Sequence, residues 1–292
     1  MQQFNRTAKV FVSGEEIIDL SSLACAFRVV KHSAGANNTM ELTIYNLSDE
    51  TRKKIVAHKS IVSINAGYGG ETSLLFRGTV WSTRFRPGTA DSSFVIEVKT
   101  GEAEAQKKIS FGLPPSSDVS EAYELIRKNA NLEYKKTGKE KNKRFPSGMQ
   151  FVGTVRDALE MLSKSTKCDW SIQDDGLQIL EVDAGVVMNP IEISPDTGLI
   201  GSPDRVSKIS SNKRAFKDAK GKTKSVKEEI PGIEFSCLLN PKIYPGSRLV
   251  LFAKEYAGKV YIAKTVTHDG VTLSSGDWVT KVEATEDPRY VV

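Results

Sequence analysis

The sequence predicts a mainly β fold with an α+β insertion, in which two tube-like β-barrel domains flank a small α/β domain. Two observations lead to this prediction. Short runs of alternating apolar and polar residues fill the first and last thirds of the chain, whereas apolar residues at helical spacing are confined to the middle. We place the domain boundaries at residues 1–103, 104–185 and 186–292, because 292 residues exceed the usual size of one compact core.

The first third contains four segments with strand periodicity. In residues 61–68, apolar side chains alternate with polar ones, and a glycine pair follows as a turn. Ser48 precedes two acidic residues, so we expect it to cap a short helix. Gly78 inside a strand pattern indicates a bulge or a close approach of two backbones. The expected strands are 40–45, 61–68, 74–81 and 94–98.

The middle third is expected to contain two amphipathic helices and a hairpin. Apolar residues recur at helical spacing between 117 and 130. A second helix is expected to begin at Thr154, because Asp157 follows three residues later, as in a capping box. Residues 169–180 then predict a strand, a tight turn at Asp174-Asp175-Gly176 and a second strand.

The last third is β-rich again, with strands expected at 232–238, 259–266 and 277–284. The stretch LLNPKIYPGSRLVL, residues 238–251, places two prolines and a glycine before an apolar run. Proline fixes its own φ and glycine permits a tight bend, so we interpret this stretch as a rigid corner that delivers a strand in one register. The residues of this turn and strand-entry motif are Asn240, Pro241, Tyr244, Pro245 and Gly246.

The strand pattern of the first third recurs near the C-terminus. The earlier succession is an alternating strand, a glycine turn and two further strands, at 62–66, 78–80 and 94–98. The later succession lies at 249–253, 263–266 and 278–282. The likeness is one of pattern and not of identity, and alternating strands resemble one another by chance, so both duplication and coincidence stay open.

Composition excludes several classes of protein. Hydrophobic content of 39% and charged content of 26% are typical of a soluble globular protein, and no apolar run approaches the roughly 20 residues of a membrane helix. The N-terminus lacks a secretory signal, so we expect synthesis and assembly in a cytoplasm, without membrane insertion. The three cysteines lie far apart without CxxC spacing, which argues against a disulfide framework or a zinc site: Cys25, Cys168 and Cys237.

No constellation of catalytic residues is recognisable. His268-Asp269-Gly270 imitates a histidine–carboxylate pair, but no nucleophile motif accompanies it. The Asp-Gly step favours a hairpin turn at this point. Gly67-Tyr68-Gly69-Gly70 lacks the ending of a phosphate-binding loop, so a hairpin turn is expected there too. The sequence therefore predicts a protein that is not an enzyme and that has no cofactor and no metal site.

The remaining histidines and acidic pairs are interpreted as surface groups. Two histidines stand next to lysines and are expected in solvent: His32 with Lys31, and His58 with Lys59. Adjacent acids in a turn, such as Asp174 and Asp175, are also expected to face water.

Positive charge is clustered in two stretches, 135–144 and 205–227, although the net charge is only +5. We expect the second to form a basic loop at about 204–229. Clustered lysine and arginine attract phosphates or an acidic partner, whereas a solvated loop is the simpler interpretation, and both stay open. Its candidate contact residues are Lys213, Arg214, Lys217, Lys220, Lys222 and Lys224.

An ordered series of motifs resembles the baseplate hub (tail hub) proteins of contractile-tailed bacteriophages. In the last third the motifs are TGLIGSP, GIEF, LLNP with the following PG, and GDW. In the first third they include AGY and FRGTV. The order of the motifs makes the resemblance specific, and it covers most of the chain. The motif residues are Gly198, Leu199, Pro203, Gly67, Tyr68, Gly78 and Trp278.

The resemblance implies a structural virion protein without an active site. Hub proteins of this family form a homotrimeric ring that joins the hexameric tail tube to the trimeric central spike, and each chain supplies two similar β-barrels. The implied partners are further copies of the chain, the tail tube protein, the central spike protein and other baseplate or tape-measure proteins. DNA is implied to pass through the channel without sequence recognition. The implied location is the phage tail baseplate, assembled in the cytoplasm of the bacterial host.

Two other functions stay open at this point. A glycan-binding tail module is suggested by Trp81 and Tyr68, which the sequence places on exposed-looking strands. A cell-wall-hydrolysing component would use His268 and Asp269.

Overall fold

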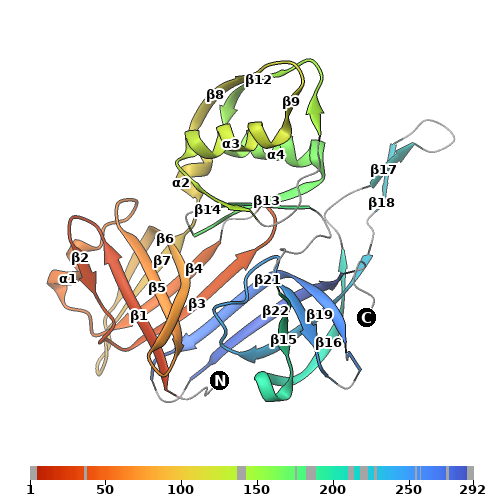
Figure 1. Ribbon diagram of the computed structural model, residues 1–292. Helices are drawn as coiled ribbons and strands as arrows, with labels where there is room; N and C mark the ends of the chain where they lie inside the picture. The colour runs from red at the N-terminus through yellow and green to blue at the C-terminus, as the bar shows by residue number, and fades with distance from the viewer. Residues whose placement is uncertain are drawn as a thin grey trace.

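The computed structural model describes residues 5–35, 38–136, 143–174, 176–181, 189–209, 214–217, 223–226, 229–253, 255–256, 258–273 and 276–287. Three units follow one another along the chain. Figure 1 shows the middle unit standing above two β units that lie side by side.

The first unit consists of seven strands and one short helix. Ser48 caps the helix as expected, since its side chain accepts a hydrogen bond from the backbone of Thr51. The elements are β1 (Arg6–Ser13), β2 (Ile17–Asp19), β3 (Cys25–His32), β4 (Thr39–Tyr45), α1 (Asp49–Lys54), β5 (Ile61–Tyr68), β6 (Glu71–Arg86) and β7 (Ser93–Lys99).

The middle unit packs two amphipathic helices against short strands. Both helices have capping boxes, at Asp118 with Glu121 and at the predicted Thr154 with Asp157. The elements are α2 (Glu102–Ala105), β8 (Lys108–Leu113), β9 (Ser117–Asp118), α3 (Val119–Ala130), β10 (Glu133–Lys136), β11 (Arg144–Phe145), β12 (Met149–Thr154), α4 (Val155–Thr166), β13 (Cys168–Gln173) and β14 (Gly176–Glu181).

The last unit is again a β unit, with one 3-10 turn. Its elements are β15 (Ile191–Ile193), η1 (Pro195–Thr197), β16 (Leu199–Ile209), β17 (Arg214–Lys217), β18 (Thr223–Val226), β19 (Glu229–Leu238), β20 (Arg248–Leu251), β21 (Lys259–Val271) and β22 (Trp278–Glu286).

The two β units are parts of one hydrogen-bonded sheet of 13 strands, in the order β16-β19-β22-β21-β3-β4-β7-β6-β5-β1-β2, with β20 and β15 alongside β21. The units join where β21 pairs antiparallel with β3, from Thr265 opposite His32 to Val271 opposite Ala26. The mainly β fold class with an α+β insertion is therefore confirmed. The predicted domain boundaries stay a prediction, because the sheet crosses between the units.

Three apolar cores lie in the chain, one for each unit. The first core also contains two residues from the last unit, Leu239 and Trp278. Trp278 is 1% exposed, and its ring meets Phe27 edge to face at 5.5 Å. The last unit therefore completes the core of the first.

The hairpin turn predicted at His268-Asp269-Gly270 is wrong. All three residues lie inside β21, where they pair with β3 on one side and with β22 on the other. Glycine is needed at 270 for space, because a Cβ there would lie 2.1 Å from the ring of Phe27. The Asp-Gly step thus reflects a close packing contact in a strand and not a turn.

The basic loop predicted at about 204–229 is also wrong where the structure describes it. Residues 204–209 continue β16 opposite β19, and β17 pairs antiparallel with β18. This small hairpin projects from the last unit in Figure 1. The high content of lysine and arginine favoured a solvated loop, but alternating residues of a paired strand can also place their charges in solvent.

Replacing Gly270 by alanine should destabilise the protein. Filling an occupied space in a packed core costs about 1–3 kcal/mol, and Phe27 occupies this space. We expect G270A to lower the urea midpoint of unfolding. The matched control is G112A on β8, where an added Cβ meets no atom closer than 3.9 Å. Equal midpoints for the two variants would contradict this account of Gly270.

Candidate assembly site at the junction of the three units

The stretch 240–247 forms a hydrogen-bonded corner before β20. Asn240 accepts a hydrogen bond from the backbone of Lys242 at 3.0 Å, and the Ser247 hydroxyl accepts one from the backbone of Tyr244 at 3.1 Å. Gly246 adopts φ +92° and donates its N–H to the Ala263 carbonyl of β21 at 2.8 Å. A left-handed φ at this point favours glycine. The local geometry is that of a rigid corner, and its role in joining subunits stays a prediction.

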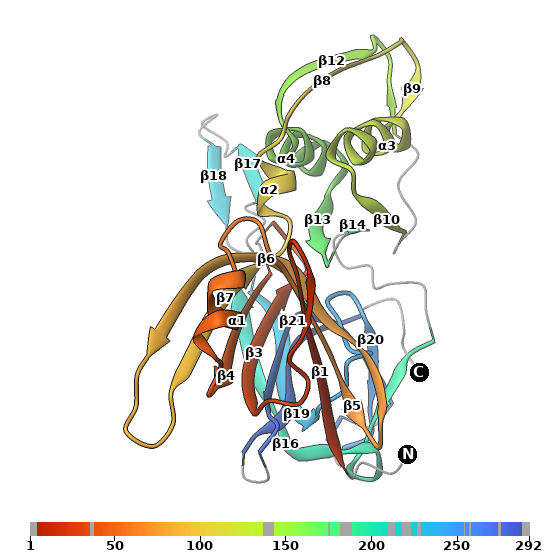
Figure 2. The ribbon, with the colours of Figure 1, turned by 90° about the vertical axis from the view of Figure 1, so that its left-hand side faces the viewer.

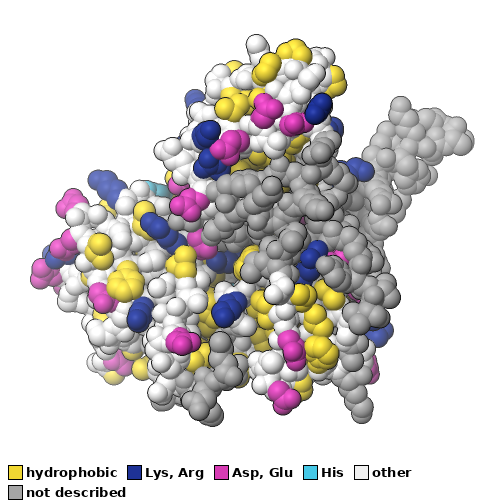
Figure 3. Space-filling model, viewed as in Figure 1, with side chains coloured by type: hydrophobic (Ala, Val, Ile, Leu, Met, Phe, Trp, Pro, Cys, Tyr) yellow, Lys and Arg dark blue, Asp and Glu magenta, His cyan; other side chains and the backbone are white. Residues whose placement is uncertain are grey.

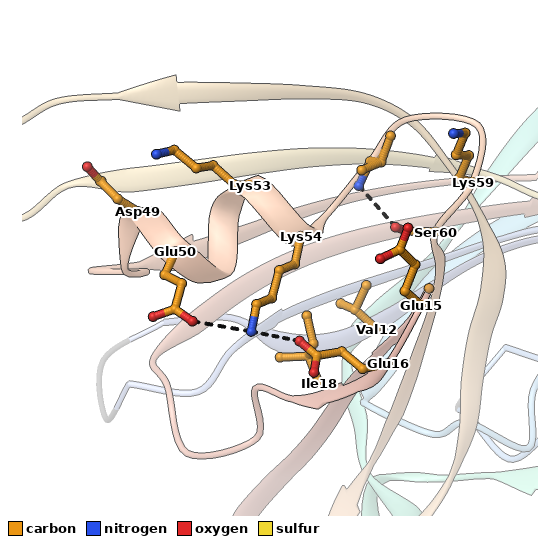
Figure 4. A pocket seen from close by; sticks show the side chains of 12 residues that line it. Val12, Glu15, Glu16, Ile18, Asp49, Glu50, Lys53, Lys54, Lys59 and Ser60 are labelled. Carbon is orange, nitrogen blue, oxygen red and sulfur yellow. Dashed lines mark hydrogen bonds and ion pairs between the residues drawn. The ribbon is translucent and has the colours of Figure 1, made fainter.

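The same corner occurs in the first unit, before β5. The Ser60 hydroxyl accepts a hydrogen bond from the backbone N–H of Val56 at 3.0 Å. This bond is the dashed line that ends at Ser60 in Figure 4. His58 adopts φ +61° and donates its N–H to the Val80 carbonyl of β6 at 2.7 Å. The backbone carbonyl of Ser60 accepts the Val80 N–H at 2.9 Å, as the carbonyl of Ser247 accepts the Ala263 N–H at 3.0 Å. The two corners therefore share three hydrogen bonds and one left-handed residue.

The two β units also share their strand order. In the first unit the order is β3-β4-β7-β6-β5-β1, and in the last it is β16-β19-β22-β21-β20-β15. In both orders the fourth strand carries a register shift against the third, between Val80 and Ser82 of β6 against β7 and between Ala263 and Thr265 of β21 against β22. The two β units differ in one pairing, because β1 runs antiparallel to β5, whereas β15 runs parallel to β20. The recurring strand pattern in the sequence thus corresponds to a repeated topology.

A buried ion pair joins the first unit to the middle unit. Lys31 Nζ lies 3.1 Å from Asp174 Oδ1, with side-chain exposures of 6% and 9%. Asp174 Oδ1 also accepts the backbone N–H of Arg77 at 3.1 Å. The expectation that Asp174 faces water is therefore wrong, and Lys31, next to a histidine that was expected in solvent, is buried as well. The physical reason is that the β13–β14 turn inserts Asp174 between β3 and β6, where its charge needs a partner.

Buried amides extend this contact across all three units. Asn38 Nδ2 donates to Gln173 Oε1 at 2.8 Å, and Gln173 Nε2 donates to the His32 carbonyl at 2.9 Å. Gln178 Nε2 reaches the last unit, where it donates to the Pro245 carbonyl at 2.9 Å. The predicted corner is therefore fastened to the middle unit through Pro245. We call this set, Lys31, Asn38, Gln173, Asp174 and Gln178, the polar seam.

Histidine 268 is fully enclosed beside the polar seam. Its Nδ1 lies 2.9 Å from the Thr280 hydroxyl. Burial lowers the pKa of His268 to about 3, with the nearby charge of Lys31 acting in the same direction, whereas a hydrogen bond with the Ile243 backbone opposes the shift. Asp269, the next residue on the strand, instead pairs with Arg28 at 3.5 Å and Lys281 at 3.6 Å. Adjacent residues of a strand point to opposite faces, so the two do not form a catalytic dyad.

The motif residues of the first unit have packing roles. Gly67 and Gly78 stand where backbones approach closely, since an added Cβ would lie 2.0 Å from the Glu71 carbonyl oxygen and 2.5 Å from that of Lys99. Tyr68 packs against the first core, and burial raises the pKa of its hydroxyl to about 12. Trp278 completes that core from the last unit.

The motif at 198–203 forms the start of β16. Gly198 ends η1, and its carbonyl accepts the Leu238 N–H at 2.8 Å. Leu199 pairs with Cys237, and buried Pro203 lies within the register shift between Ile200 and Asp204. Proline fits such a bulge because it has no N–H to donate to the ladder.

The candidate basic residues are only partly placed. Arg214 and Lys217 lie on β17 and Lys224 lies on β18, opposite Phe216. Lys213, Lys220 and Lys222 lie outside the described residues. Their proposed contact with a partner stays a prediction.

The aromatic residues suggested for glycan binding are not arranged as a platform. Tyr68 has its hydroxyl buried. Trp81 is 38% exposed, and Lys99 Nζ covers its ring at 3.8 Å while His58 meets it edge to face. One face of the indole is therefore already occupied by a cation.

A hollow of about 1000 Å³ lies between α1 and the β1–β2 turn. Lys54 bridges it, with Nζ 2.7 Å from Glu16 and 3.4 Å from Glu50 (Figure 4). Both acids of these pairs are exposed, so the hollow has the character of a charged surface. In the part of the chain that the structure describes, no group of three histidine, cysteine or acidic residues could hold a metal ion, and no helix is long and apolar enough to cross a membrane.

Sequence reasoning missed the polar seam, although one signal of it was present. Cys25, Phe27, Val29 and Lys31 alternate on one face of β3, so strand periodicity alone places Lys31 on the buried side. Gln178 likewise stands between apolar residues in β14. In the sequence, nothing identifies the partners of these residues, because the partners come from other units.

The fold is that of several tail proteins of known structure. No protein-family model matches the sequence, and no curated protein matches it. A 43 kDa tail protein of prophage MuSo2 from Shewanella oneidensis is 9% identical, with a TM-score of 0.61 over 96% of this chain and 98% of that chain. A tail protein from Neisseria meningitidis is 10% identical, with a TM-score of 0.63 over 97% of both chains. An E. coli component of the type VI secretion system is 8% identical, with a TM-score of 0.57 over 91% of this chain and 74% of that chain.

Breaking the Lys31–Asp174 pair should be strongly destabilising. Removing one partner leaves a buried, uncompensated charge, which costs about 3–5 kcal/mol. We expect K31M to lower the free energy of unfolding by this amount and the double variant K31M/D174N to recover part of it. The control is K54M, which removes an exposed pair and should cost far less, because exposed ion pairs add little to stability. Chemical denaturation measures all three, and similar losses for K31M and K54M would contradict the assignment.

His268 should make the protein sensitive to acid. Above about pH 6.5 the imidazole is neutral in both states, but below that pH the unfolded chain takes up a proton that the folded protein excludes until about pH 3. Stability therefore falls with falling pH in this window, by about 2 kcal/mol at pH 5. We expect H268Q to show a smaller loss between pH 7 and pH 5 than the wild type, in urea unfolding. H58N, at a turn histidine, should keep the wild-type loss.

Proposed function

We propose that the protein is a structural component of a phage-type tail baseplate, and specifically its hub. The observation that carries this proposal is the repeated β unit, which has the same strand order and the same corner twice in one continuous sheet. The likeness of the whole chain to tail proteins over nearly their full length supports it.

The repeat suits a symmetry adaptor. In a closed ring, each surface patch of the chain appears as many times as there are copies in the ring. A chain that carries the same unit twice therefore presents six similar units in a ring of three copies. Such a homotrimer would match a hexameric tail tube on one side and a trimeric central spike on the other, and would leave a channel for DNA.

The rigidity of the junction favours a mechanical role. The two β units share a ladder of backbone hydrogen bonds between β3 and β21, and the buried polar seam fastens the middle unit to both. Because buried hydrogen-bonded groups are costly to separate, relative motion of the units is opposed. A baseplate part that holds a tube in line needs this property.

The geometry gives less support to the two other functions. The hydrolase would need His268 and Asp269 to act on one substrate, but His268 is 1% exposed and Asp269 is held by two basic residues. The glycan-binding module would need open aromatic faces, and Trp81 is covered by Lys99. We therefore infer a protein that acts through its shape and not through catalysis.

The proposed partners are further copies of the chain, the tail tube protein, the central spike protein and neighbouring baseplate or tape-measure proteins. Acidic and basic side chains are interspersed on the face shown in Figure 3, without one extended field of a single sign among the coloured residues. We propose that DNA passes through the channel of the ring in transit, without sequence recognition. The proposed location is the virion, with assembly in the host cytoplasm.

The test combines a measurement of mass with an image. We expect purified protein to give the mass of three copies in light scattering at high concentration, and electron microscopy to show rings with three-fold or pseudo-six-fold symmetry. Mass spectrometry of purified tail particles should detect the protein. A protein that stays monomeric and is absent from tail particles would refute the proposal.

A further inference from the structure

The end of β6 has one open edge. The equivalent part of β21 in the last unit has none. From Ser82 to Arg86, β6 pairs with β7 on one side, and no strand pairs with its other side among the residues described. In the last unit, the equivalent part of β21 pairs with β22 and also with β3. Figure 2 shows the β6–β7 hairpin extending beyond the body of the molecule.

The register shifts make the two edges equivalent residue by residue. Ser82 is the first residue of β6 after its shift, as Thr265 is in β21. Each stands opposite a glutamate of the next strand, Glu97 and Glu283 respectively. Four residues further on, Arg86 of β6 therefore corresponds to Asp269 of β21.

Strand β3, which covers the edge of β21 inside the chain, also has an equivalent in the last unit, namely β16. In the first unit, Arg28 of β3 pairs with Glu41 of β4, which pairs with Glu97. In the last unit, Asp204 of β16 pairs with Glu234 of β19, which pairs with Glu283. Asp204 therefore corresponds to Arg28. Like the edge of β6, the side of β16 away from β19 has no partner strand in the described part of the chain.

We propose that the edge of β6 over Ser82–Arg86 pairs antiparallel with β16 over 204–208 of a second copy of this chain. The internal pairing of β3 with β21 sets the register, and it places Arg86 opposite Asp204 and Arg84 opposite Val206. This inference rests on the proposed ring, and it identifies the surface through which the copies join. Each copy then has one β6 edge and one β16 edge, a head-to-tail contact that generates a closed ring when the rotation closes.

Charge complementarity supports this pairing. Inside the chain, Arg28 on β3 lies 3.5 Å from Asp269 on β21. At the contact between copies the acid and the base change places, with Asp204 on β16 and Arg86 on β6. Both side chains are exposed in the single chain. The exchange keeps opposite charges face to face.

Pairing with a second copy would also cover two exposed features of the single chain, the open edge of β6 and the side chain of Phe85. An uncovered, regular strand edge is a template for pairing with another chain. Phe85 on this edge is 42% exposed, whereas its equivalent, His268, is 1% exposed beneath β3. A second copy on β6 would bury Phe85 as β3 buries His268.

Charge reversal tests the contact. We expect R86E and D204R each to raise the concentration for half-assembly about tenfold or more in light scattering, because each places like charges opposite each other. The double variant R86E/D204R should return to within about threefold of the wild type. K108E, which reverses an exposed charge on β8 of the middle unit, should assemble as the wild type does.

Cysteine pairs test the register independently of assembly strength. Opposite residues of antiparallel strands have Cβ atoms about 4.5–5.5 Å apart, close enough for a disulfide after small adjustments. We expect R84C/V206C to form covalently linked oligomers on mild oxidation, in purified protein and in tail particles. The control R84C/R205C pairs positions that face opposite sides of the sheet and should stay uncrosslinked. The native cysteines are buried.

The outcomes separate this inference from the proposed function. If three-copy rings form but the single charge variants assemble as the wild type does, or R84C/V206C does not link, the strand pairing is wrong and the hub proposal stands. If the wild type never assembles and is absent from tail particles, both are wrong. Restored assembly in the double variant together with specific linking of R84C/V206C supports both.

Discussion

Strand β21 is bonded to both β units at once, and the rest of the architecture depends on this double pairing. Its first residues pair with β20, and beyond the register shift after Ala263 it pairs with β3. A bulge bends a strand and increases its twist, which lets one strand leave one curved sheet and enter another. Since the same ladder belongs to both units, neither unit can rotate without breaking backbone hydrogen bonds.

The middle unit is attached to the β units by another kind of interaction, between buried polar side chains. Its contacts with the β units include a buried ion pair and directional amide hydrogen bonds at 2.8–2.9 Å. Such groups gain little net stability from pairing, but they are costly when left unpaired. They therefore select one orientation of the middle unit over all others. The corner at Pro245 and Gly246 takes part in this selection, because one carbonyl of the corner is bonded to Gln178.

Local signals in the sequence predicted much of the fold. Alternation located β4, β5 and β7, and capping residues located α1 and α4, because these signals lie within one element. The turn predicted at His268-Asp269-Gly270 failed because Phe27, which excludes a side chain at 270, is distant in sequence. The polar seam was missed for the same reason. Strand periodicity places Lys31 on the buried side of β3, but its partner and those of the other members come from other units and cannot be found from the local sequence.

The shared strand also has a consequence for how the chain is made. During synthesis the first unit leaves the ribosome long before β21 and Trp278 exist, and the Thr272 hydroxyl that donates to the Cys25 carbonyl is 247 residues away in sequence. Until then the edge of β3 is uncovered and the first core lacks Trp278 and Leu239. Such an edge is a site for pairing with other nascent chains. The first unit therefore reaches its final structure only when the whole chain has been released, so that a truncated product carries an open edge instead of a finished domain.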